Sequence, residues 1–123
     1  MSVRGEVIAI LDDITMLGKR NYADERPEGE TLPHTVLLDG VSQAPTLSGD
    51  SKTLAWSHLL QVDLWEDAGV ATEATRDTVI QALDGAVIDG AFHLRVQAAD
   101  RVFDPDRRLA HTAITLRTVR LRG

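Results

Sequence analysis

The chain has 123 residues, with 19 acidic and 13 basic side chains and a formal net charge of -6. Its length suits a single domain, residues 1–123, that buries one core. The absence of cysteine excludes a disulfide framework, a zinc ribbon and a thiol nucleophile, and the acidic balance argues against a protein that binds nucleic acid through clustered Lys and Arg.

The first predicted element is an amphipathic helix over residues 2–18. Its apolar side chains recur at the spacing of one helix face: Val3, Val7, Ile10, Leu11, Ile14 and Leu17. Ser2 can cap its start and Gly18 ends it. Because the apolar positions are spaced rather than continuous, the segment is neither a signal peptide nor a membrane span, and we expect a soluble, cytosolic chain without a membrane partner. Residues 19–33 predict a surface loop.

Two strands and a long connector follow. "HTVLLDG" (34–40) is β-branched and bounded by Pro33 and Gly40, as is typical of a strand. The polar stretch 41–52 is an unusually long connector, which favours a role such as contacting a neighbouring molecule. Residues 56–65 alternate in polarity, which predicts a half-buried strand. Trp65 falls in the polar phase, so it is either an exposed anchor for a partner or a cover for the sheet edge.

A second helix is predicted after the turn "EDAG". Thr72 can cap it, Val79, Ile80, Leu83 and Val87 supply its apolar face, and Gly85 is a natural stop. The carboxylates of this region are expected in the turn or on the solvated helix face, where charge is ordinary. They are Glu66, Asp67, Glu73, Asp77 and Asp84.

The last third predicts an antiparallel hairpin. "AFHLRVQAADRVFD" and "RRLAHTAITLRTVRLR" alternate in polarity, and Asp104 and Pro105 suit the first positions of a type I turn between them. The element order is helix, strand, strand, helix, strand, strand. This order indicates an α+β fold with a single antiparallel or mixed sheet of about four strands and two helices packed on one face.

The sequence shows no pattern for catalysis or cofactor binding. The four histidines lie on predicted strands, but alternation assigns His34 and His58 to one face and His93 and His111 to the other. No metal-binding spacing, GxSxG, P-loop or GxGxxG occurs. We therefore expect no enzyme and no catalytic, cofactor or metal site.

Charge is unevenly distributed along the chain. Residues 1–90 hold 16 acidic and 6 basic side chains, a net of -10, whereas residues 91–123 hold 3 acidic and 7 basic, a net of +4. Within one copy this asymmetry is ordinary intramolecular balance. Between copies it would favour head-to-tail contacts, which can close into rings.

The chain resembles the tail terminator proteins of long-tailed bacteriophages and related tail-completion and head-to-tail joining proteins. The likeness lies in the order and spacing of an N-terminal helix, a strand begun by Pro33, a strand ending at Trp65, a helix closing on "ALDG" (82–85), and a final hairpin read "H...I.LR" from His111 to Arg117. The connector 41–52 departs from this pattern.

The resemblance implies a hexameric ring that caps the tail tube, terminates tail polymerisation and joins the tail to the head connector, within the virion. The implied partners are other copies, the tail-tube protein and a connector or stopper protein, with DNA passing through the lumen without specific binding. Besides the connector 41–52, the candidate interface residues are Trp65, Arg95, Asp104, Arg107, Arg108, Arg117 and Arg120. The alternatives are another neck component, such as a head-tail stopper or adaptor, or a small enzyme of an unrecognised family.

Overall fold

A computed structural model gives the arrangement of most of the chain. It describes residues 3–25, 31–39, 46–47, 53–55, 59–68, 73–88, 90, 92–102 and 108–120. The predicted turn residues Asp104 and Pro105 and the predicted cap Thr72 lie outside these ranges.

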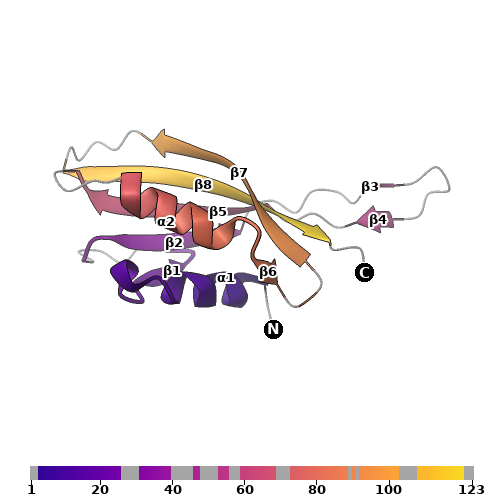
Figure 1. The fold of residues 1–123 in the computed structure, drawn as a ribbon. Helices are drawn as coiled ribbons and strands as arrows, with labels where there is room; N and C mark the ends of the chain where they lie inside the picture. Colours follow the sequence, from indigo (N-terminus) through magenta and orange to yellow (C-terminus); the bar gives the residue numbers. More distant parts are fainter. Residues whose placement is uncertain are drawn as a thin grey trace.

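The fold is α+β, with a six-stranded mixed sheet in the order β1-β2-β5-β8-β7-β6 (Figure 1). The strands are β1 (Asn21–Ala23), β2 (His34–Asp39), β5 (Leu59–Asp67), β6 (Val87–Ile88), β7 (Phe92–Val102) and β8 (Leu109–Arg120). Only the β1–β2 pair is parallel; the other neighbours are antiparallel. The expectation of about four strands was therefore too low, because β1 and β6 are two- or three-residue strands that carry no periodic signal of their own.

A separate two-stranded sheet lies in the stretch between β2 and β5. Strand β3 (Thr46–Leu47) pairs with β4 (Thr53–Ala55) and with no strand of the larger sheet. Figure 1 shows β3 and β4 projecting beyond the end of β8. The predicted polar connector therefore contains strand β3.

The helices are α1 (Val3–Asp12) and α2 (Glu73–Leu83), with a short 3-10 helix, η1 (Thr15–Leu17), after α1. The predicted helix 2–18 is thus broken, because Ile14 is extended (φ -82°, ψ 108°). Gly18 ends this region as predicted, in the left-handed conformation. Val87, predicted for the second helix face, lies instead in β6 and is 60% exposed. No helix among the described residues has the length and hydropathy to cross a membrane.

Both helices pack on one face of the sheet and enclose the core. The alternating residues Leu60, Val62 and Leu64 of β5 pair in register with Leu116, Ile114 and Thr112 of β8, so they share a face. Val7 and Leu11 of α1 and Val79 and Leu83 of α2 cover this face and are fully buried with it. The period-two pattern of β5 and β8 and the helical pattern of α1 therefore predicted the core correctly.

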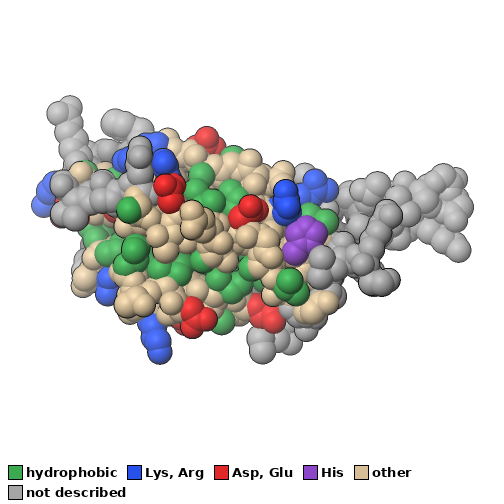
Figure 2. Space-filling model, in the orientation of Figure 1, with side chains coloured by type: hydrophobic (Ala, Val, Ile, Leu, Met, Phe, Trp, Pro, Cys, Tyr) green, Lys and Arg blue, Asp and Glu red, His purple; other side chains and the backbone are tan. Residues whose placement is uncertain are grey.

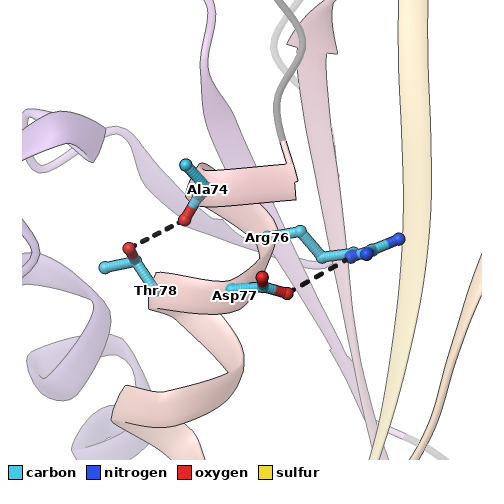
Figure 3. A network of polar contacts seen from close by, with 4 residues as sticks. All are labelled: Ala74, Arg76, Asp77 and Thr78. Carbon is cyan, nitrogen blue, oxygen red and sulfur yellow. Dashed lines mark hydrogen bonds and ion pairs between the residues drawn. The ribbon is translucent and has the colours of Figure 1, made fainter.

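On the helix side, the described residues do not gather charges of one sign. Figure 2, in the orientation of Figure 1, shows acidic and basic side chains scattered among apolar ones over the face that the helices cover. On α2, Arg76 Nε lies 3.7 Å from Asp77 Oδ1, so these two opposite charges are neighbours on the same helix (Figure 3). In the same turn, the Thr78 hydroxyl donates a hydrogen bond to the Ala74 carbonyl at 2.8 Å. Asp77 and Asp84 are exposed as expected. Glu66, by contrast, is buried in β5, since that strand extends to Asp67 through the predicted turn.

Candidate assembly interface

The sheet has a second face, the outer face, which looks away from the helices. Side chains alternate along each strand, so the residues between the core positions project to this side. On β5 and β8 these positions include Asp63, Trp65, His111 and Arg117. On β7 they include Arg95, which is paired with Arg117. Three of the predicted interface residues, Trp65, Arg95 and Arg117, therefore share one face.

An aromatic row crosses one end of the outer face. It consists of Tyr22, His34, Trp65 and His111. Trp65 lies between the two imidazoles, stacked 5.7 Å from His34 and 4.1 Å from His111 between ring centroids. Tyr22 meets His34 edge-on at 6.2 Å. The register explains the row, because His34, Trp65 and His111 are direct partners across β2, β5 and β8.

The sequence predicted Trp65 either as an exposed anchor or as a cover for the sheet edge, and its observed position differs from both. It is half-buried in β5, which lies between β2 and β8, and so it does not cover a sheet edge. Its ring faces are occupied by neighbours in the same chain, so it is not a fully exposed anchor either. Stacking of this kind rigidifies a surface, and Trp65 is part of a preformed platform.

A buried carboxylate supports the row. Asp63 is 5% exposed, accepts a hydrogen bond from Gln61 Nε2 at 2.8 Å, and has its Oδ1 3.1 Å from His111 Nε2. A buried carboxylate needs such partners because its desolvation is costly. This contact places the Asp63 carboxylate beside the His111 ring that stacks on Trp65. Sequence reasoning missed Asp63 as a structural group; its only signal was that it shares the phase of Trp65.

The prediction that His34 and His111 point to opposite faces was wrong. The register places His34, His93 and His111 on the outer face together. Alternation within one strand determines only relative phase, and the phase between strands depends on register. His58 lies outside the described residues. Within the described ranges, no group of three or more His, Asp or Glu is arranged to hold a metal ion.

At the other end of the outer face, Arg95 of β7 lies directly opposite Arg117 of β8. Arg95 is exposed and Arg117 is half-buried. Like charges at directly opposed positions disfavour each other in a sheet, so the apposition of these two side chains does not by itself stabilise the fold. Positive charge of this kind suits contact with an acidic surface.

The remaining predicted interface residues lie elsewhere. Arg108 is exposed at the start of β8, and its carbonyl accepts a hydrogen bond from the Ala68 amide at 2.8 Å, which holds the hairpin against the end of β5. The backbone of Arg120 is paired with Phe92. Asp104 and Arg107 are outside the described residues. The structure thus brings together Trp65, Arg95 and Arg117 on one face, whereas Arg108 directly precedes β8.

Comparisons with known proteins identify relatives of this fold. Residues 7–120 match the family described as "Tail completion protein gp17". The chain is also similar to a chain of a solved structure, "Virion of native gene transfer agent (GTA) particle", with a TM-score of 0.69 and 22% sequence identity over 99% of this chain and 96% of that chain. No curated protein matches the sequence.

Proposed function

The chain belongs to the tail completion protein gp17 family, and on that premise we propose that it forms a ring that caps the tail tube, terminates tail polymerisation and joins the tail to the head connector. A member of this family is a structural component of the phage tail, and its location is the virion. The observation that carries the proposal is the extent of the family match, residues 7–120 of 123. The role is mechanical, with no reaction catalysed.

The open sheet supports assembly into a ring. Its outer face combines the aromatic row with the Arg95–Arg117 pair, and among the described residues its edge strands, β1 and β6, do not pair with each other. Contacts between two different surfaces of neighbouring copies generate closed rings when the rotation closes. The resemblance to tail terminators supplies the number of copies, which we propose is six.

Charge supports the passage of DNA through such a ring. The net charge of -6 disfavours retention of DNA, since non-specific binding depends on neutralising phosphates with Lys and Arg. We expect the positive side chains of the hairpin to face protein partners rather than DNA. We propose that these partners are the acidic surfaces of a neighbouring copy, the tail-tube protein, or the connector or stopper protein.

Native mass spectrometry of the purified chain, alone and mixed with the tail-tube protein of the same phage, tests the proposal. We expect a six-copy species, either alone or on mixing, together with shorter and more uniform tubes when the chain is added during tube polymerisation. A strict monomer under both conditions would overturn the capping function. Binding to the connector without binding to the tube would instead identify a stopper or adaptor.

A further inference from the structure

Strand β7 has β8 along one edge. Along its other edge, its backbone hydrogen-bonding groups are paired over only part of its length. Beside Phe92 and His93 it pairs with β6. Next, the Leu94 amide donates to the Ala86 carbonyl at 2.8 Å, and the Val96 amide donates to Asp84 Oδ1 at 3.0 Å. Among the described residues, no strand lies beside β7 from Ala98 to Val102 on the side away from β8. Within the described part of the chain, this segment is therefore a sheet edge without a paired strand, and it is called the free edge below.

The register identifies the backbone groups that this edge presents. The amides of Leu94 and Val96 point away from β8, and their partners on β8 are Thr118 and Leu116. Ile114 and Thr112 lie two and four residues before Leu116 on β8, so their backbone N–H and C=O groups point in the same direction as those of Leu116. Beyond the bulge between Val96 and Ala98, these residues pair with Ala99 and Arg101. The amides of Ala99 and Arg101 therefore also point away from β8.

Natural proteins usually protect such an edge. Here the protection ends at Asp84, whose carboxylate accepts the hydrogen bond of the Val96 amide. Asp100, Arg101 and Val102 are exposed, Val102 by 36% of its surface. A five-residue edge with two outward amides is long enough to accept another strand.

The β3–β4 sheet also lacks a neighbouring strand among the described residues. It consists of two short strands with a register shift between them, and it pairs with no strand of the six-stranded sheet. A two-stranded sheet alone in water is marginally stable at best, whereas adding it to a larger sheet stabilises it. Two of its residues, Thr46 and Thr53, are of a type that strands favour.

The two elements lie at opposite ends of their own molecule. The stretch that holds β3 and β4 leaves β2 at Asp39 and enters β5 at Leu59, beside Arg117 of β8. The free edge ends at Val102, beside His111. Six residues of strand separate these positions on β8, or about 20 Å, and Figure 1 shows β3 and β4 projecting away from the β7 end. The β3–β4 sheet of one copy can therefore meet the free edge of a neighbouring copy while it still projects away from its own β7 end.

We propose that the β3–β4 sheet of one copy pairs with the free β7 edge, Ala98–Val102, of the next copy. The contact joins two different surfaces, so it repeats head to tail, and it forms a closed ring when the rotation between neighbouring copies closes. The inference rests on the proposed ring function and names the element that holds adjacent copies together. Main-chain hydrogen bonds supply the contact, as in other cases of strand addition.

Arg101→Pro and Arg101→Ala form a matched pair of variants that tests the edge. Proline removes the outward amide but no bond to β8, whereas alanine removes the side chain and keeps the amide. Under conditions in which the unmodified chain assembles, we expect Arg101→Pro to lower the assembled fraction by about tenfold or more, and Arg101→Ala to assemble normally. Circular dichroism and urea unfolding establish that both remain folded. Normal assembly of folded Arg101→Pro would overturn the inference.

A mixing experiment tests the other partner. Asp39 pairs with Leu60 across β2 and β5, so positions 40 and 59 are the next to be opposed, and a two-residue Gly-Asn hairpin turn between them can replace residues 41–58 and remove β3 and β4. This shortened chain keeps the edge, and Arg101→Pro keeps the β3–β4 sheet. We expect each to be monomeric alone and their 1:1 mixture to form a dimer, but nothing longer, in sedimentation velocity. Two folded monomers in the mixture would overturn the pairing.

These experiments distinguish failure of the proposed strand pairing from failure of the proposed ring function. A multi-copy species that persists in Arg101→Pro and in the shortened chain refutes this contact and leaves the ring function intact. A 1:1 dimer of the two variants, with an unmodified chain that never binds or caps the tail tube, supports the contact and refutes the function.

Discussion

The Trp65 indole stacks on the His111 imidazole with ring centroids 4.1 Å apart and planes 14° from parallel. The two residues are direct partners across β5 and β8. His34 stacks on the other side of the indole, so the aromatic row continues across three strands. A tryptophan held in this way contributes to folding stability as well as to any contact with a partner.

Trp65→Ala should lower the free energy of unfolding by about 3 kcal/mol, the low end for loss of a large aromatic side chain, because Trp65 is half-buried rather than fully buried. Trp65→Phe, which preserves part of the stacking, should cost markedly less. Urea unfolding followed by circular dichroism measures both. A tryptophan that served only as an exposed anchor would leave the unfolding midpoint unchanged in both variants.

The contact between Asp63 and His111 should appear as energetic coupling. Removing either partner leaves the other polar group in a poorly solvated site. In a double-mutant cycle with Asp63→Ala and His111→Ala, we expect a coupling of about 1 kcal/mol. Additive effects would mean that Asp63 stabilises the sheet through Gln61 alone.

Charge reversal at Arg95 should affect folding and assembly in opposite directions. Arg95→Glu replaces a repulsive pair opposite Arg117 with an attractive one, so stability should rise slightly, by about 0.5 kcal/mol. If the arginines face an acidic partner, the same change weakens assembly in native mass spectrometry. Arg95→Lys, which keeps the charge, is the control. Greater stability with unchanged assembly would remove Arg95 from the interface.

Arg108→Glu should leave the monomer folded and weaken assembly. The side chain is exposed, and the bond that holds this end of the hairpin uses the Arg108 carbonyl, which the substitution retains. Because substitutions at exposed positions usually change stability by no more than about 0.5 kcal/mol, thermal unfolding should remain close to that of the unmodified chain. Assembly equal to that of the unmodified chain would exclude the tip at Arg108 from the contact.

Gly18→Ala should destabilise the chain by about 1 kcal/mol or more. Gly18 has φ of +55°, where an L side chain is strained, and an added Cβ would meet the Arg20 guanidinium. That guanidinium donates to the Pro33 carbonyl at 3.0 Å, so its displacement also disturbs the entry to β2. Urea unfolding measures the loss, and a stability equal to that of the unmodified chain would contradict the strain.

Local patterns in the sequence were sufficient for the larger elements. The alternation of Leu60, Val62 and Leu64 predicted β5 and its buried side, and the spacing of Val7 and Leu11 predicted the buried side of α1. The break at Ile14 was not predictable in this way, because Ile14 fits the apolar period and is itself 7% exposed although its backbone leaves the helix. Packing at the end of α1 overrides the periodicity there.

The sequence alone determined the α+β class and the positions of the long strands, since both depend on residues that are close together in the chain. It also determined the resemblance to tail completion proteins, which depends on the order and spacing of these elements. The tertiary structure decided which side chains share a surface. The row from His34 through Trp65 to His111, the opposition of Arg95 and Arg117, and the free edge at Ala99 and Arg101 all depend on register between strands. Register is set by pairing between distant segments, and a shift of one residue would move every side chain of a strand to the other face.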